Sequence, residues 1–93
     1  RAVELQSRYG VDIAMALDAL DARVSAELAG WPETEALVRL ALGEYALGHG
    51  RAGLAVRNLQ RALELERGLN PADAGRAREL LERARLQAAQ EGR

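Results

Sequence analysis

Apolar residues recur along this chain at steps of three and four, the spacing that gathers side chains on one face of an α-helix. Glycine and proline interrupt the pattern in places that are typical of helix ends. The pattern predicts four main helices, over about residues 12–29, 33–47, 51–67 and 72–90. Residues 1–10 add a short helical segment that ends at Gly10, because glycine is typical of a helix C-cap. We therefore expect an all-α fold made of antiparallel helical hairpins.

The helix predicted over residues 33–47 is apolar on almost every side. Its apolar residues are Ala36, Leu37, Val38, Leu40, Ala41, Leu42, Tyr45, Ala46 and Leu47, and only Glu35, Arg39 and Glu44 interrupt them. A helix with this composition is typically covered by other helices. We expect it to be the central helix, with the other helices packed around it.

The preceding helix carries one apolar stripe, which we expect to be buried. The stripe consists of Ile13, Leu17, Leu20, Val24, Leu28 and then Trp31. Asp18, Arg23 and Glu27 fall outside this stripe, so we expect them to face solvent. We expect Trp31 to pack between helices as a wedge, although its position at a helix junction also suits stacking against a ligand.

Two prolines mark the starts of later helices, because proline is tolerated at the first helical position. Pro32 opens the helix predicted over about residues 33–47 at its first position, and Pro71 opens the last helix. The inner faces of the last two helices are predicted to be Ala52, Ala55, Val56, Leu59, Ala62 and Leu63, and Ala74, Ala77, Leu80, Leu81, Ala84 and Ala88. Small residues dominate both faces, which favours closely packed helices.

Composition and charge limit the function classes of this 93-residue chain, which is long enough for one domain over residues 1–93. Cysteine is absent, so disulfides and thiolate metal sites are excluded. Residues 1–50 contain 4 Arg and 8 acidic residues, whereas residues 51–93 contain 9 Arg and 6 acidic residues. This asymmetry is compatible with solvated helix faces or with an Arg-rich surface that meets an acidic partner. The net charge of -1 argues against a dedicated nucleic-acid binder.

The first ten residues are similar to residues 61–70. Arg1, Ala2, Glu4 and Leu5 match Arg61, Ala62, Glu64 and Leu65. Chance similarity between helices rich in Arg, Ala, Leu and Glu is one explanation, and a degenerate helix-hairpin repeat is the other. The repeat interpretation places the first residues inside a hairpin. In addition, the chain begins with Arg rather than Met. We therefore expect it to be part of a longer protein.

Residues 36–65 contain Leu42-Gly43, Gly50, Ala55, Leu59 and Ala62-Leu63, and in this spacing they resemble one tetratricopeptide repeat, a unit of two antiparallel helices. These residues fall where that family has its Leu-Gly pair, its turn glycine and its spaced small and large residues. Two features depart from the pattern: the aromatic residue of the first helix stands at Tyr45 rather than at Ala46, and Pro71 comes a few residues late. The resemblance implies stacked helical hairpins.

This resemblance implies a concave groove lined by the first helix of each hairpin. Here Leu37, Leu40, Glu44 and Leu47 would face that groove and bind an apolar or amphipathic segment of a protein partner. The expected function is therefore that of a protein–protein interaction scaffold or adaptor. Two alternatives stay open: residues 12–31 cover these leucines, or an uncapped end of the repeat pairs with a second copy in a homodimer.

A helix-turn-helix is the other interpretation of the same hairpin. Ala46, Gly50, Val56 and Leu59 have the small, turn and apolar spacing of that motif. Its second helix would present a basic surface able to read DNA base edges, made of Arg57, Asn58, Gln60 and Arg61. His49 and Arg51 argue against this interpretation, because the motif usually has apolar residues at their positions.

Catalysis has the least support in the sequence. The single histidine, His49, lies in a glycine turn, and one histidine does not make a zinc site alone. Ser7 and Ser25 have no base at a recognisable spacing. No glycine loop of a nucleotide-binding type is present. We expect a protein that is not an enzyme, with no catalytic residue, no metal and no cofactor.

Overall fold

The computed structural model describes the backbone of residues 2–65 and 69–91, and the side chains from residue 15 onward within those ranges. It contains four helices: α1 (Ala2–Glu27), α2 (Pro32–Gly48), α3 (Ala52–Glu64) and α4 (Pro71–Glu91). No strand occurs in these ranges. The predicted all-α fold with about four helices is confirmed.

The N-terminal helix differs from its prediction. Residues 2–27 form one continuous helix of 26 residues, so the expected break at Gly10 and the separate segment over residues 1–10 are wrong. A single glycine inside a helix costs only about 1 kcal/mol relative to alanine, and no proline stands in this part of the chain to stop the helix. The described residues before Gly10 therefore continue directly into the helix that follows.

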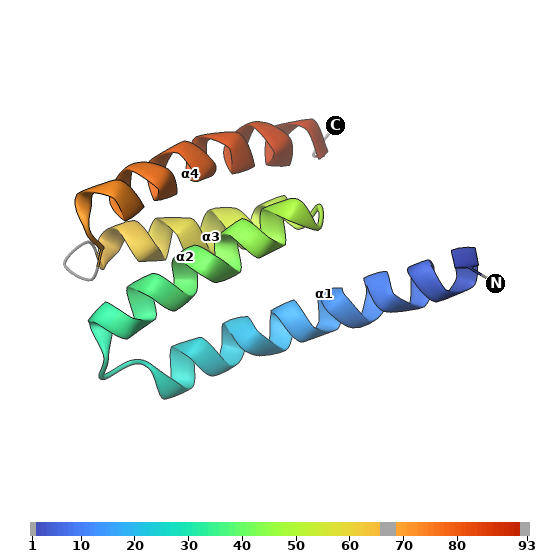
Figure 1. Ribbon diagram of the computed structural model, residues 1–93, viewed down its shortest axis with the longest axis horizontal. Coiled ribbons are helices and arrows are strands. Elements are labelled where there is room, and N and C mark those ends of the chain that lie inside the picture. Colours follow the sequence, from blue (N-terminus) through green and yellow to red (C-terminus); the bar gives the residue numbers. More distant parts are fainter. Residues whose placement is uncertain (1, 66–68, 92–93) are drawn as a thin grey trace.

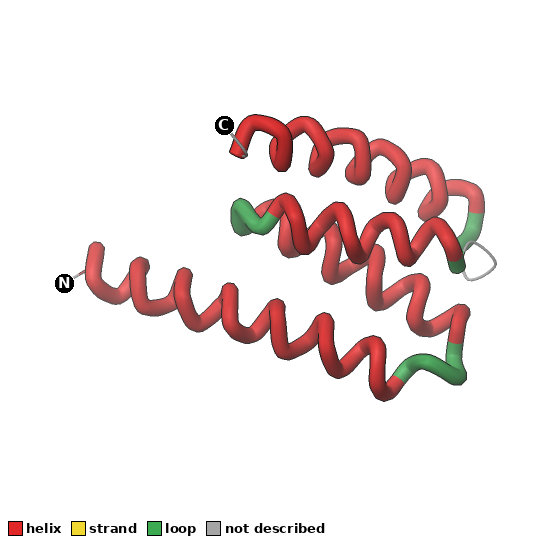
Figure 2. The backbone as a smooth tube through the Cα atoms, turned by 180° about the vertical axis from the view of Figure 1, so that it is seen from behind, coloured by secondary structure: helices red, strands yellow, loops and turns green. Residues whose placement is uncertain are grey.

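The helices are arranged as a compact three-helix body with one diverging helix. Figure 1 shows α2 and α3 side by side as an antiparallel hairpin, with α4 beside α3. The first helix lies on the opposite side of α2, and its N-terminal half extends away from the other helices (Figures 1 and 2). The main core lies in the body, because most buried apolar side chains come from α2, α3 and α4.

The α2 helix is covered on two sides, and the expectation that it is covered on every side is wrong. Ala36, Leu40 and Ala46 are buried in the core. Leu37 and Tyr45, in contrast, are 49% and 51% exposed. A strip of apolar surface therefore remains open along α2.

The α2 helix packs tightly against Leu59 of α3 at Gly43. A Cβ atom placed at this glycine would lie 2.6 Å from Cγ and 2.8 Å from Cδ2 of Leu59. Leu59 itself is fully buried, so it fills the space that the missing side chain leaves. The absence of a side chain at Gly43 is therefore what lets α2 and α3 pack closely at this position.

The turns between helices follow the glycine and proline positions of the sequence. Pro32 and Pro71 are the first residues of α2 and α4, as predicted. Gly50 has a φ of 74°, a left-handed conformation that glycine adopts without strain. The expected end of α3 near residue 67 was too late, because α3 ends at Glu64; residues 66 and 67 lie outside the described residues.

Two apolar positions of the predicted α1 stripe are exposed instead of buried. Leu17 and Val24 are buried as expected, but Leu20 is 49% exposed and Trp31 is 67% exposed. Backbone hydrogen bonds close the turn around Trp31, whose N–H donates to the Leu28 carbonyl at 2.9 Å. The indole therefore lies outside the packed helices and is not a wedge. Ile13 lies outside the described side chains.

Replacing Gly43 by alanine should destabilise the protein by about 1–3 kcal/mol, because the new Cβ overlaps the buried Leu59. The matched control is Gly75→Ala in α4, where a Cβ atom would have nothing within 4 Å. That change should stabilise the protein by about 0.5–1 kcal/mol through helix propensity alone. Urea unfolding measures the free energy of unfolding of both variants. Equal changes in the two variants would contradict the close approach of Gly43 to Leu59.

Candidate functional site

An apolar groove lies between α1 and α2, with a volume of about 480 Å³. Its lining comes from both helices: Ala16, Leu17, Leu20, Val24, Val38, Ala41, Leu42 and Tyr45. The tyrosine hydroxyl is the single polar side-chain group among these residues. The groove therefore suits an apolar occupant.

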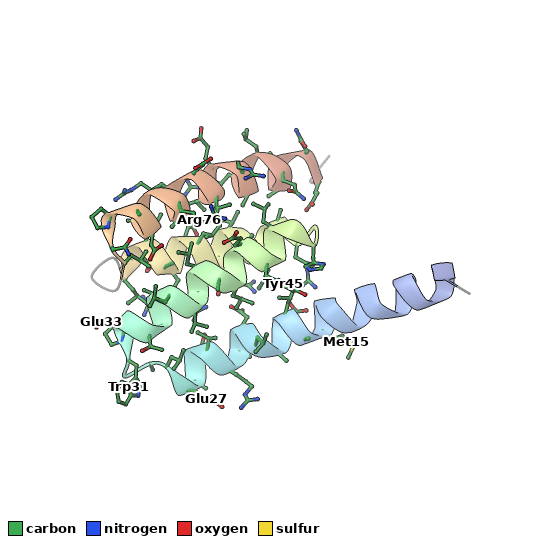
Figure 3. The ribbon with its side chains drawn as sticks, viewed as in Figure 1. Met15, Glu27, Trp31, Glu33, Tyr45 and Arg76 are labelled. Atoms are coloured by element: carbon green, nitrogen blue, oxygen red, sulfur yellow. The ribbon has the colours of Figure 1, made fainter. Side chains whose placement is uncertain are left out.

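The floor and the rim of the groove differ in exposure. Leu17 and Leu42 form the floor and are 1% and 7% exposed. Leu20 and Tyr45 form the rim, and about half of each side chain reaches solvent. Figure 3 shows Tyr45 on the side of α2 that faces α1, whereas Met15 points away from the other helices. A bound molecule would contact the buried leucines of the floor and the apolar side chains of the rim.

The two walls follow from the spacing of apolar residues in each helix. Leu17, Leu20 and Val24 recur at steps of three and four on α1, which places them on one face. Val38, Leu42 and Tyr45 do the same on α2. Leu17, Val24 and Leu42 on these faces are buried, whereas Leu20 and Tyr45 stay about half exposed, so the two faces cover each other only in part.

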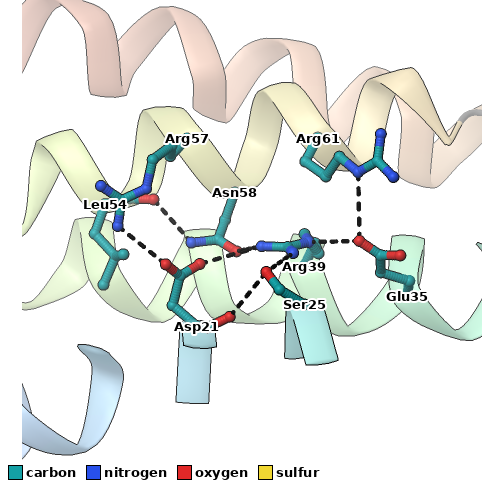
Figure 4. Close-up of polar contacts among 8 residues, drawn as sticks. All are labelled: Asp21, Ser25, Glu35, Arg39, Leu54, Arg57, Asn58 and Arg61. Carbon is teal, nitrogen blue, oxygen red and sulfur yellow. Dashed lines mark hydrogen bonds and ion pairs between the residues drawn. The ribbon is translucent and has the colours of Figure 1, made fainter. Parts of the chain in front are cut away.

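A buried polar cluster joins α1, α2 and α3 (Figure 4). Its centre is Arg39, whose side chain is 8% exposed. Arg39 Nε donates to Glu35 Oε2 at 2.9 Å, and Nη1 donates to Asp21 Oδ1 at 3.1 Å. Nη1 also donates to Asn58 Oδ1 at 2.8 Å, and Nη2 donates to Ser25 Oγ at 2.8 Å. One guanidinium thus contacts partners on all three helices.

The partners of Arg39 are themselves satisfied by further contacts. Asn58, which is fully buried, donates from Nδ2 to the Leu54 carbonyl at 3.0 Å. Arg57 donates to the second oxygen of Asp21 at 3.0 Å, and Arg61 lies 3.4 Å from Glu35. Across the described residues, every buried side-chain nitrogen or oxygen has a hydrogen-bond partner. Such satisfaction is what makes a buried charge tolerable.

This cluster fixes one wall of the groove. Asp21 and Ser25 directly follow the groove residues Leu20 and Val24 on α1, and they contact Arg39 on α2. Because the guanidinium is planar and holds its donors in a rigid fork, these bonds restrict the position of α1 relative to α2. The width of the groove therefore depends on the Arg39 cluster.

The four residues expected to line one groove occupy different environments. Leu37 is half exposed, while Leu40 is 7% exposed and belongs to the core. Glu44 forms an ion pair with Arg76 of α4, and Leu47 is half-buried against the core. The structure therefore does not bring the four side chains together in one open groove.

The alternative basic surface is occupied by contacts within the chain. The expectation that Asn58 is exposed is wrong, because it is fully buried beneath Arg39. Arg57 and Arg61 are exposed, but they contact Asp21 and Glu35. Asn58 is therefore not available to read base edges, and the two arginines pair with acidic side chains of the same molecule.

Ion pairs within the molecule join the acidic first half of the chain to the basic second half. Arg51 contacts Asp18 at 2.7 Å, and Arg57 contacts Asp21 at 3.0 Å. Glu44 and Arg76 form a further pair between the two halves. Several acidic residues of the first half of the chain therefore pair with arginines of the second half within the same molecule.

Sequence reasoning missed the polar cluster, although two signals for it were present. Glu35 and Arg39 stand four residues apart on an otherwise apolar helix, a spacing that lets two side chains meet. Asn58 interrupts the apolar face of α3 between Ala55 and Ala62. Polar residues on two facing apolar helices could have indicated a shared buried site.

Comparison of the chain with protein-family models, with curated proteins and with solved structures finds no match. The resemblance to a tetratricopeptide repeat therefore stays a prediction. Among the described helices, none is long and apolar enough to cross a membrane. No group of three or more His, Cys, Asp or Glu side chains within the described ranges could hold a metal ion.

Replacing Arg39 by leucine should destabilise the protein by about 3 kcal/mol, because two acidic side chains lose their central cation inside the fold. Arg23→Leu is the matched control, since Arg23 forms only an exposed pair with Glu27; we expect a change below about 0.5 kcal/mol. Urea unfolding followed by circular dichroism gives both values. Wild-type stability in the Arg39 variant would show that the cluster contributes little.

The Glu44–Arg76 pair should add stability only while Glu44 is ionised. Hydrogen bonds from Arg76 lower the pKa of the Glu44 carboxyl below its ordinary value of 4.5. A carboxyl with a lowered folded-state pKa stabilises the protein above its unfolded-state pKa, and this contribution is lost as the pH falls through the folded-state value. Arg76→Gln should therefore destabilise the protein at pH 7 and have little effect at pH 2, measured by urea unfolding at both values. An effect of equal size at both values would exclude the charge as its cause.

Proposed function

We propose that this chain is a protein–protein interaction module whose α1–α2 groove binds one amphipathic helix of a partner protein. The observation that carries the proposal is the open apolar groove of about 480 Å³ between the two helices. Exposed apolar surface of this kind is a common feature of interaction sites. The proposed binding site is the groove between α1 and α2, and it differs from the four residues expected from the family resemblance.

The shape of the groove favours a helix as occupant. Its two walls are helices, and their apolar side chains form rows at steps of three and four. A third helix can insert leucine-sized side chains between such rows, as helices do in grooves that recognise amphipathic segments. A helix also satisfies its own backbone hydrogen bonds, which an apolar groove cannot do for an extended peptide.

The lining of the groove gives less support to a small polar ligand. Small-molecule sites usually combine apolar walls with several polar groups that fix the orientation of the ligand. Here the Tyr45 hydroxyl is the single polar side-chain group of the lining. No specific observation supports DNA binding or catalysis as a second function.

The proposal is tested with a displayed library of amphipathic helical peptides, selected for binding to the wild-type chain. Peptides with leucines at steps of three and four should be recovered. Leu20→Glu combined with Tyr45→Glu should weaken their binding by at least about tenfold, because each change places a charge at the apolar rim. Fluorescence anisotropy of labelled peptides measures the affinities.

The matched control is Leu86→Glu, which alters an exposed leucine on α4 away from the groove. It should leave peptide binding unchanged, and circular dichroism should show that all variants are folded. Equal binding to the groove variant and to the wild type would contradict the proposal. A wild-type dimer in sedimentation that the groove variant abolishes would replace the partner helix by a second copy of the chain.

A further inference from the structure

The α1 helix is joined to the rest of the molecule by a small set of contacts. Among its described side chains, the buried apolar ones are Leu17 and Val24. Polar contacts from Asp18, Asp21 and Ser25 complete the attachment. These contacts come from residues 17–25 of the 26-residue helix, and Figure 1 shows its N-terminal half diverging from the other helices.

The other three helices have a core of their own. Leu59 of α3 and Leu80 and Leu81 of α4 are buried, and Gly43 allows close packing between α2 and α3. None of these residues belongs to α1. The body therefore keeps most of its apolar core if α1 moves away.

The connection between α1 and the body is a short exposed turn. Residues 28–31 join the two helices, and Ala29, Gly30 and Trp31 are all exposed. A Cβ atom at Gly30 would have nothing within 4 Å, so no side chain packs against this point of the turn. Leu28 packs against the core, so residues 29–31 are the part of the turn that can absorb the backbone changes of a hinge.

The polar cluster divides cleanly between the two parts. Asp21 and Ser25 are its members on α1, while Glu35, Arg39 and Asn58 belong to the body. If α1 moves away, Arg39 keeps its bonds to Glu35 and Asn58 and gains access to water. The body therefore loses no essential partner when the α1 half of the cluster is removed.

We propose that α1 is a hinged arm, held on the α2–α4 body by a latch that consists of Asp21 and Ser25 on α1 and Arg39 on α2. When the latch is broken, α1 moves away as a unit about residues 29–31 while the body stays folded. Because α1 forms one wall of the groove, the state of the latch also sets how far the groove is open. This inference does not depend on what binds in the groove.

Distance measurements between spin labels test this inference directly. The chain has no cysteine, so each introduced pair of cysteines is labelled without competition. An arm pair, Ala19→Cys with Ala89→Cys, reports the position of α1 relative to α4, and both positions are exposed. A body pair, Thr34→Cys with Ala89→Cys, reports α2 relative to α4.

The latch variant combines Asp21→Ala with Ser25→Ala. In this variant the distance distribution of the arm pair should broaden and shift, while that of the body pair stays narrow. Amide hydrogen exchange should be faster in α1 of the latch variant than in the wild type. In α3, the protection against exchange should be the same in both. The wild type should show one narrow distribution for each pair.

The matched control combines Arg23→Ala with Glu27→Ala, which removes an exposed ion pair that lies entirely within α1. It should leave both distributions unchanged. An unchanged arm distribution in the latch variant would overturn the inference, because the apolar contacts alone would then hold α1. Broadening of both pairs would overturn it as well, because α1 would then be an inseparable part of the fold.

Discussion

One buried guanidinium, that of Arg39, connects three of the four helices of this protein. It contacts Asp21 and Ser25 on α1, Glu35 on α2 and Asn58 on α3 at distances of 2.8–3.1 Å. Apolar packing alone tolerates small shifts between helices, whereas a planar cation with fixed donors does not. The relative position of α1 and α2, and with it the groove between them, therefore depends on this interaction.

The groove is the consequence of a helix that is only partly covered. The α2 helix uses Ala36, Leu40 and Ala46 for the core and leaves Leu37 and Tyr45 half exposed. On α1, Leu17 is buried beside the half-exposed Leu20. Contiguous exposed apolar side chains often mark interaction sites, which is why we connect the groove with binding of a partner helix.

Much of the fold could be predicted from the sequence, because helix periodicity and the positions of Pro32 and Pro71 depend on local chemistry. The position of α1 and the site could not be predicted. Periodicity alone shows which residues share a face, but it does not show that Leu20 lacks a covering helix or that Asn58 meets Arg39. Those facts depend on contacts between residues far apart in the chain. The break expected at Gly10 failed because one glycine is too weak a signal to end a helix.

The most direct test of this account is a methyl NMR titration of the full chain with a helical peptide selected for groove binding. The account predicts that the methyl signals of Leu20, Val24 and Val38 shift as the peptide is added, because these side chains line the groove. Signals of Leu63 and Leu86, outside the groove, should stay in place. Shifts confined to Leu63 and Leu86, with those of the groove unchanged, would contradict the account.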